Sequence, residues 1–255
     1  MNDRPLEGRT ALVTGGGVGI GAAIALALAQ DGARVAVTYR THEPDPVVLQ
    51  RLTEASRVPV QARKVEATDD DQVRQAVADV VADSGGLDIL VNNVGGLVQR
   101  ATLDQLDLAT WRDIIAVNLD SMFLFTHHAR AHLVASTAGR VVNLASLAAH
   151  SGGHPGALAY ATSKAAVLGF TRALATELGP DGVTVNALAP GFIEATPFHD
   201  TFTTAASKAR TIEGVPLGRA GTPADVAGAA AWLAGDHAAY VSGAVIDLNG
   251  GQYFH

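Results

Sequence analysis

Tyr160 and Lys164 are four residues apart in the run Ala159–Lys164, and this pair could do acid–base chemistry. If the segment is helical, residues i and i+4 share a face, so the phenol and the ammonium group would reach into one cleft. A free tyrosine has a pKa of about 10, and a fixed cation beside it favours the phenolate and lowers that pKa. The spacing predicts a tuned general acid/base, but many helices place Tyr and Lys four apart, so the surrounding residues must decide.

The sequence around this pair alternates strand-like and helix-like segments. Apolar, β-branched runs predict strands at 10–13, 35–39, 58–65, 87–91, 140–144, 184–187 and 244–248, and helical patterns cover 20–30, the stretch from Asp70, 110–135, 156–178 and 223–233. This alternation predicts an α/β fold, a Rossmann-like, doubly wound parallel sheet of about seven strands with helices on both faces. Because no Pro/Gly/Ser-rich linker divides the chain, we expect one domain over residues 1–255, with an irregular substrate loop near 192–218.

The composition limits the possible functions. Of 255 residues, 48% are hydrophobic and 17% are charged, as in globular chains. There are no cysteines, which excludes disulfides, a thiolate nucleophile and a Cys-based zinc site and fits a reducing, cytoplasmic location. The formal net charge of −7, without a basic cluster, argues against nucleic acid as a partner, and no apolar run is long enough to span a membrane.

A glycine-rich run, Thr14–Gly21, lies directly between the first predicted strand and the first predicted helix. Glycines permit a tight turn, and the helix N-terminus behind them offers free N–H groups and the positive end of a dipole to a phosphate. An ordinary Gly-rich turn is the alternative, but the position in the first βα unit favours dinucleotide binding.

Further motifs follow in a fixed order. They are Asn92-Asn93-Val94-Gly95, Asn118, Asn143–Ser146, Tyr160-x-x-x-Lys164, Pro190-Gly191 and Asn249-Gly250-Gly251. With the T-G-x-x-x-G-I-G pattern of the glycine loop, this series resembles the classical short-chain dehydrogenase/reductase family over essentially the whole chain, and it is similar to the 3-oxoacyl-[acyl-carrier-protein] reductase-like members. Two spacings depart from the family pattern: one extra residue separates Ser146 from Tyr160, and one extra residue lies between Pro190-Gly191 and Thr196.

The resemblance implies an enzyme that acts on CH–OH groups, such as a carbonyl reductase. Tyr160 would exchange a proton with the substrate oxygen, and Lys164 would lower the pKa of Tyr160 and bind the nicotinamide ribose. Ser146 would position the substrate oxygen, and Asn118 would hold a water that links Lys164 to solvent. The residues implied for the dinucleotide are Thr14, Gly15, Gly17, Val18, Gly19, Ile20, Tyr39, Arg40, Thr41, Glu66, Ala67, Asn93, Val94, Gly95, Tyr160, Lys164, Pro190, Gly191, Ile193 and Thr196.

The end of the second predicted strand bears on the choice of cofactor. NAD-specific members of the family usually have an acidic residue there, which accepts a hydrogen bond from the ribose 2′-OH. Here the position holds Tyr39, followed by Arg40 and Thr41, so no carboxylate would repel a 2′-phosphate and Arg40 can pair with one. We therefore expect NADP(H), with NAD(H) as the alternative, although Val18 stands where many NADP-binding relatives carry a basic residue.

The expected substrate is a small-molecule ketone or secondary alcohol of apolar or aromatic character. Its pocket would be formed by mainly apolar or small residues, Gly95–Val98, Leu147–His154, Phe192 and 198–202. The alternative is a 3-oxoacyl-[acyl-carrier-protein] reductase of fatty acid synthesis. It is disfavoured because Thr137 and Thr176 stand where such relatives bind the acidic carrier through basic residues, and because the chain is itself acidic.

Two further alternatives belong to other classes. A non-catalytic dinucleotide sensor would not need the intact acid/base set, and a methyltransferase would leave Asn92–Gly95 and Tyr160/Lys164 unexplained. His128 and His132 are four apart but lack an evident third ligand, so no metal site is expected, and His150 and His154 are expected to be exposed loop residues. By resemblance, the chain would form a homotetramer through the helices near 110–135 and 156–178.

Overall fold

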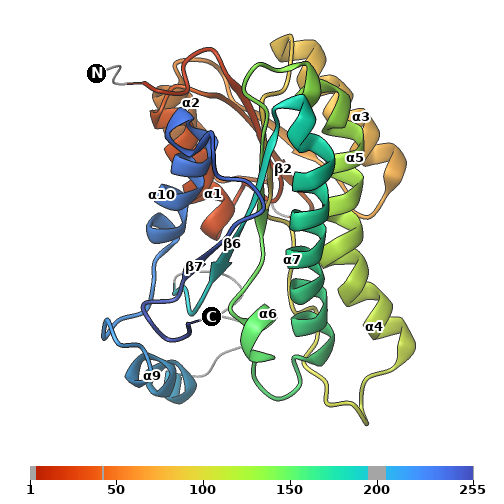
Figure 1. Cartoon of the computed structure of the whole chain (residues 1–255), viewed down its shortest axis with the longest axis vertical. Coiled ribbons are helices and arrows are strands. Elements are labelled where there is room, and N and C mark those ends of the chain that lie inside the picture. Colours follow the sequence, from red (N-terminus) through yellow and green to blue (C-terminus); the bar gives the residue numbers. More distant parts are fainter. Residues whose placement is uncertain (1–3, 42, 195–204, 255) are drawn as a thin grey trace.

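Seven parallel strands form the centre of the molecule (Figure 1). The computed structural model describes residues 4–41, 43–194 and 205–254. The strands are β1 (Thr10–Val13), β2 (Arg34–Tyr39), β3 (Gln61–Lys64), β4 (Ile89–Asn92), β5 (Arg140–Leu144), β6 (Thr184–Pro190) and β7 (Val245–Leu248). Their order is β3-β2-β1-β4-β5-β6-β7 and every pair is parallel, so the predicted doubly wound sheet is confirmed.

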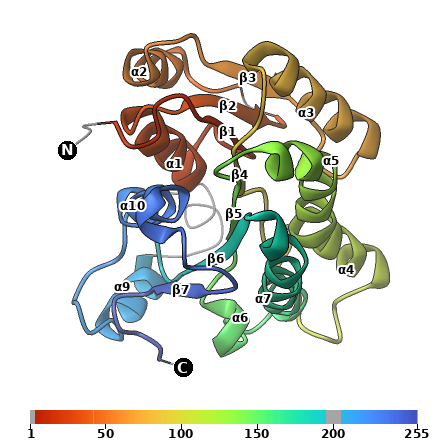
Figure 2. The same ribbon diagram turned by 45° about the horizontal axis from the view of Figure 1, so that its top comes forward.

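Helices cover both faces of this sheet (Figure 2). They are α1 (Gly19–Gln30), α2 (Pro46–Ser56), α3 (Asp70–Ser84), α4 (Leu108–Ile115), α5 (Ser121–Ala135), α6 (Ala148–Ser151), α7 (Leu158–Leu178), α9 (Ala205–Glu213) and α10 (Pro223–Ala234). On one face α1, α2 and α10 pack around an apolar core that includes Ile24, Leu52 and Leu233. On the other face α3, α5 and α7 share a core that includes Val77 and Phe125. No described helix is both long and apolar enough to cross a membrane.

The structure differs from the predicted elements in several places. The strand expected at 58–65 is limited to Gln61–Lys64, the residues that pair with β2. The helix expected at 110–135 is divided into α4 and α5 by a π-helical turn at Ala116–Asp120. The helix α2 was not predicted, although Asp45 caps it by accepting a hydrogen bond from Val47 N at 2.8 Å. The helix α6 was not predicted either, and the segment 192–218, which contains α9, was expected to be irregular.

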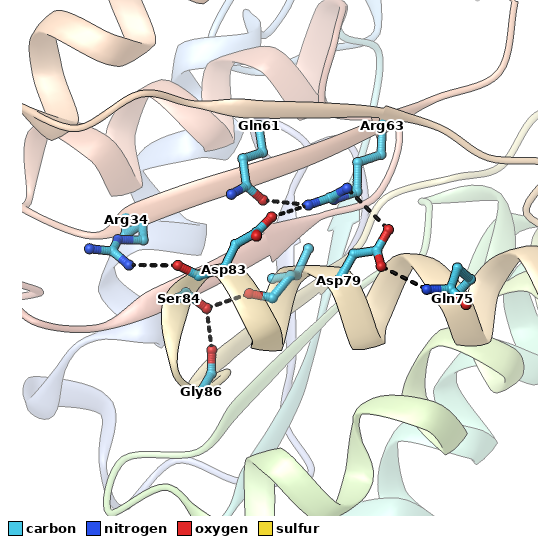
Figure 3. Close-up of polar contacts among 9 residues, drawn as sticks. Arg34, Gln61, Arg63, Gln75, Asp79, Asp83, Ser84 and Gly86 are labelled. Atoms are coloured by element: carbon cyan, nitrogen blue, oxygen red, sulfur yellow. Dashed lines mark hydrogen bonds and ion pairs between the residues drawn. The ribbon is translucent and has the colours of Figure 1, made fainter.

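Charged and amide side chains hold the edge strand β3 in place (Figure 3). Arg63 Nη1 lies 3.2 Å from Asp79 Oδ2 on α3, and the same guanidinium pairs with Asp83 and donates to Gln61 at 2.8 Å. Gln75 donates to the second Asp79 oxygen at 2.7 Å. Polar side chains on an edge strand also discourage pairing with another sheet. The network therefore holds β3 in place, and the segment that follows β3 forms part of the wall of the candidate site.

Candidate active site

One large cavity, of about 1160 Å³, opens along the carboxyl ends of the strands. Its walls come from the segments that follow the strands and from parts of α4, α7 and α9, and they include Gly15, Arg40, Glu66, Asn93, Ser146, Tyr160, Lys164 and Pro190. The strand order reverses between β1 and β4, and doubly wound sheets bind ligands at such a switch point. The cavity thus joins the glycine loop to the acid/base pair.

The glycine loop after β1 forms a backbone cradle. The Thr14 hydroxyl accepts hydrogen bonds from the backbone N–H groups of Asn93 (2.9 Å) and Val94 (3.1 Å), which ties the loop to the end of β4. A side chain at Gly21 would collide with the Gly15 carbonyl oxygen and come within 2.5 Å of Asn93 Nδ2, so α1 packs directly on the loop. No described side chain caps the N-terminus of α1, and its N–H groups are available to a phosphate. This cradle fits the pyrophosphate of a dinucleotide.

Tyr160 and Ser146 meet in the cavity from different elements. Tyr160 lies in the first turn of α7, and Ser146 directly follows β5. Their hydroxyl groups form a hydrogen bond, and Ser146 Oγ also accepts one from Ala148 N at 3.1 Å. The extra residue between them falls in the segment of α6 and the loop after it, where Gly152 and Gly156 have φ of 77° and 79°. That loop absorbs the longer spacing, and the two side chains still meet.

Lys164, one turn further along α7, is buried beneath Tyr160. Its side chain is 4% exposed, its ammonium donates to the Leu144 carbonyl oxygen at 2.7 Å, and Nζ lies 5.9 Å from the centre of the Tyr160 ring. Burial lowers the pKa of Lys164 from 10.5 to about 8.

The pKa of Tyr160 corrects one expectation. Burial raises this pKa above its ordinary value, and the hydrogen bond from Ser146 opposes the rise only in part. The net shift of the Tyr160 pKa is thus upward and not downward as expected, because desolvation of the phenol dominates and the Lys164 ammonium is directed at the Leu144 carbonyl oxygen. The phenol is protonated at neutral pH, as it would be at its ordinary pKa of about 10, and it therefore carries a proton to donate.

Asn118 lies in the π-helical turn and is 1% exposed. Its amide nitrogen donates to the carbonyl oxygens of Ile114 and Gly96, both at 2.8 Å, and its Oδ1 accepts from Gly96 N at 3.0 Å. A side chain at Gly95 would lie 2.6 Å from Asn118 Oδ1 and 2.9 Å from Lys164 Nζ. The Asn118 side chain thus fixes the loop that packs against Lys164, while its role in a proton relay stays a prediction.

The structure brings most of the predicted dinucleotide residues into the cavity wall. These are Gly15, Val18, Gly19, Ile20, Tyr39, Arg40, Glu66, Ala67, Asn93, Val94, Gly95, Tyr160, Lys164, Pro190, Gly191 and Ile193. Of the predicted dinucleotide residues that the structure describes, Thr14, Gly17 and Thr41 do not line it, and neither does Asn118, which was predicted as a catalytic residue. Thr14 braces the loop, and Gly17 faces Pro44, which would lie 3.0 Å from an added Cβ. Thr196 and residues 198–202 lie outside the described residues.

Several wall residues were not predicted from the sequence. Among them are Gly21, Thr38, Val65, Thr68, Arg100, Asp113, Thr211, Gln252 and Tyr253. Gly21 belongs to the quoted glycine motif and could have been included. Gln252 and Tyr253 reach the cavity only because β7 lies beside β6, which no local pattern in the sequence reveals.

The histidines divide into different environments. His150 is not the exposed residue expected: its side chain is 10% exposed, it stacks on Tyr253 with ring centres 5.5 Å apart, and its Nε2 lies 3.7 Å from Asp247 Oδ1. His154 is exposed and lines the cavity. His128 Nε2 lies 2.7 Å from Asp70 Oδ1, and the described residues contain no group of three or more potential metal ligands.

Similarity to known proteins agrees with this geometry. A family model described as enoyl-(acyl carrier protein) reductase matches residues 16–253. The chain is 35% identical over 251 residues to the 3-oxoacyl-[acyl-carrier-protein] reductase FabG of Aquifex aeolicus, covering 97% of this chain and 98% of that protein. The chain belongs to the short-chain dehydrogenase/reductase family. It is an oxidoreductase of classical type that acts on CH–OH groups with NAD(P).

Other members of the short-chain dehydrogenase/reductase family match at similar levels. FabG of Staphylococcus aureus is 36% identical over 248 residues, covering 96% of this chain and 98% of that protein. A dehydrogenase/reductase from Sinorhizobium meliloti has a TM-score of 0.90 and 36% identity, covering 99% of this chain and 98% of that one. The NADH-dependent reductase A1-R′, responsible for alginate metabolism, has a TM-score of 0.88 and 33% identity, and the match covers 98% of this chain and 99% of that one.

The glycine cradle of this short-chain dehydrogenase/reductase gives a first prediction. Gly21→Ala should weaken NADPH binding about tenfold or more and lower the Tm, because the added methyl group forces α1 away from the loop. Gly228→Ala is the matched control, since Gly228 lies in α10 with open space at its Cα and should tolerate Ala. Calorimetric titration and thermal denaturation measure both effects; equal NADPH affinity in the two variants would contradict the prediction.

Proposed function

We propose that this short-chain dehydrogenase/reductase reduces a ketone on a small, mainly apolar molecule to a secondary alcohol with NADPH. The Tyr160 phenol is the observation that supports this most: it lies in the same cavity as the glycine loop and is hydrogen-bonded to Ser146. The nicotinamide supplies a hydride when it is bound. As negative charge develops on the substrate oxygen, the Ser146 hydroxyl stabilises it and Tyr160 donates its proton.

Lys164 and Asn118 support this step in the proposal. Lys164 would hold the nicotinamide ribose, since Lys164 lines the cavity and its ammonium lies close to Gly95 in the loop after β4. Asn118 would act as a positioning residue by holding Gly95 and Gly96 against Lys164. The dinucleotide would occupy the wall from the glycine loop to Pro190–Ile193.

The preference for NADPH over NADH rests on Arg40. Arg40 is exposed and lines the cavity just beyond β2, where a 2′-phosphate on the adenosine would lie. Glu66 lines the same end, and its carboxylate accepts a hydrogen bond from Thr68 at 3.2 Å. NADH stays the alternative, since the similar reductase A1-R′ is NADH-dependent.

Arg40→Leu tests this preference. The variant should lose about tenfold or more in kcat/KM with NADPH and change little with NADH, because only NADPH carries the 2′-phosphate. Arg51→Leu is the control, since Arg51 is exposed on α2 and lies outside the cavity wall. A parallel loss with both cofactors would contradict the assignment of Arg40.

A second candidate function comes from the names of similar proteins. FabG of both species is a 3-oxoacyl-[acyl-carrier-protein] reductase, so this chain could act on a carrier-bound acyl group. Two observations argue against this second function. Thr137 and Thr176 stand where basic residues would be expected to bind the carrier, and the net charge of −7 would repel an acidic carrier.

A substrate panel decides between the two functions and tests the proposal itself. The panel contains neutral ketones, their alcohols, and the same 3-oxoacyl group free and on the carrier protein, each with NADPH and NADH. Absorbance of the reduced nicotinamide measures turnover. Turnover of free ketones supports the proposal, reduction of the carrier-bound group alone supports the second function, and tight NADPH binding without turnover would indicate a sensor.

The proposal also covers assembly and organisation. We expect one domain, located in the cytoplasm, in a homotetramer formed through α5 and α7. Phe123 on α5 and Leu158 on α7 are 50% and 42% exposed, which leaves apolar surface on these helices in a single chain. Sedimentation velocity gives the assembly state directly.

A further inference from the structure

The loop after β4 contains a strained turn that faces the cavity. Val98 has a φ of 58°, and Gln99 N donates to the Leu97 carbonyl oxygen at 2.6 Å across it. For a β-branched residue, this left-handed region is a genuine outlier. Val98 is 50% exposed and lines the cavity, so it gains little hydrophobic stabilisation that could offset the backbone strain. Strain of this kind gathers where a loop must present side chains to a ligand.

The residue that this turn presents is Arg100. Its Nη1 donates to the Pro155 carbonyl oxygen at 3.0 Å, and the next residue, Ala101, donates its N–H to the Gly156 carbonyl oxygen at 3.0 Å. Gly156 has a φ of 79°, and a side chain there would lie 2.6 Å from Arg100 Cγ. The arginine stem is therefore held against the loop that leads into Tyr160, with the side chain in the cavity wall.

The charge of Arg100 has no carboxylate partner within the described part of the chain. Its hydrogen bond to Pro155 uses one of five N–H donors, and the acceptor is a neutral carbonyl group. The other cationic side chains of the wall are placed elsewhere: Lys164 is directed at Leu144, and Arg40 lies at the end of β2. His154 and Asp113 also line the wall, and Asp113 forms no ion pair with Arg100.

We propose that Arg100 binds an anionic group of the substrate, a carboxylate or a phosphate, at the cavity end beyond Ser146 and Tyr160. Arg100 is exposed, and its one hydrogen bond at Nη1 leaves other N–H groups that can be offered in parallel to a planar anion. Asp113 on α4 disfavours an anion on its own side, so the anionic group lies toward Arg100 and His154. This inference rests on the proposed ketone reduction, and it limits the substrate to ketones that carry negative charge away from the carbonyl.

The experiment compares levulinate and its longer homologues with their primary amides, using the full chain with NADPH. The wild-type kcat/KM should favour the acid of one chain length over its amide by about 10- to 100-fold. Arg100→Met should remove this preference by raising KM for the acid alone. Arg51→Met, a variant of an exposed arginine outside the cavity wall, should behave as wild type.

A second pair of substrates distinguishes the sources of the anion. A 3-oxoacyl thioester of pantetheine is tested with and without the phosphate on the pantetheine. A preference for the phosphorylated thioester, lost in Arg100→Met, identifies a phosphorylated acyl arm, and a preference for the oxo acid identifies a free acid. The inference would be overturned if the wild type preferred neither the oxo acid nor the phosphorylated thioester. Equal losses of activity with charged and neutral substrates in Arg100→Met would overturn it as well.

The two proposals can fail separately. If neutral ketones are reduced but charge has no effect, ketone reduction stands and the role of Arg100 is refuted. If no ketone is reduced, calorimetric titration of the NADPH complex with the oxo acids and the phosphorylated thioester decides: binding that Arg100→Met weakens supports the anion site, and binding unaffected or absent refutes it.

Discussion

Tyr160→Phe is expected to lower the rate of ketone reduction by about 10²–10⁴-fold, the usual contribution of a general acid. The substituted ring keeps its position in the first turn of α7, but it has no proton to give and leaves Ser146 without this hydrogen bond. NADPH affinity should change little, because the phenol is only one of many groups along the cavity wall. Turnover is measured by nicotinamide absorbance and affinity by calorimetric titration.

Tyr240→Phe is the matched control for this variant. Tyr240 is fully exposed and lies outside the cavity wall, so loss of its hydroxyl should leave turnover unchanged. The acid role would be refuted if Tyr160→Phe kept wild-type turnover. Loss of turnover together with loss of NADPH binding would indicate a structural role for the phenol.

Lys164→Met should reduce turnover by about 10²-fold or more and change how stability depends on pH. Burial places the pKa of Lys164 at about 8 in the folded chain, against 10.5 when it is exposed. Below pH 8 the buried ammonium opposes folding by about 3 kcal/mol. Because the unfolded state binds more protons between pH 8 and 10.5, wild-type stability gains this amount as pH rises through that window.

The Met variant has no such titrating group and should lack this gain. Urea unfolding at pH 7 and pH 10 measures the difference, with Lys64→Met as a control because Lys64 is exposed on the edge strand β3. Met is close to Lys in length but has neither a charge nor a hydrogen-bond donor. The variant therefore lacks the hydrogen bond to Leu144 at both pH values. An unchanged gap between wild type and Lys164→Met at the two pH values would contradict the lowered pKa of Lys164.

Local signals in the sequence were sufficient for most of the fold. The strands that are buried on both faces, such as β1, β4 and β5, are mainly apolar, and a strong α3 pattern follows from Val73, Val77 and Val80. The prediction was poorest where a segment is polar or short. The strand β3 is Gln-Ala-Arg-Lys, and its boundaries depend on pairing with β2 and on the bonds of Arg63 to α3.

The reaction class could be inferred from residue types that follow one another in a fixed order: the glycine loop, Asn118, Ser146, Tyr160 and Lys164. Such motifs can be recognised in a sequence because the chemistry of each one requires particular side chains at particular spacings. The tertiary structure decided the electrostatics, since the pKa of Tyr160 and Lys164 follow from burial, and burial is a property of the packed chain. The tertiary structure also decided which side chains surround the substrate near Tyr160. Arg100, Asp113 and Tyr253 belong to different elements, and they line one cavity because of the order of the strands in the sheet.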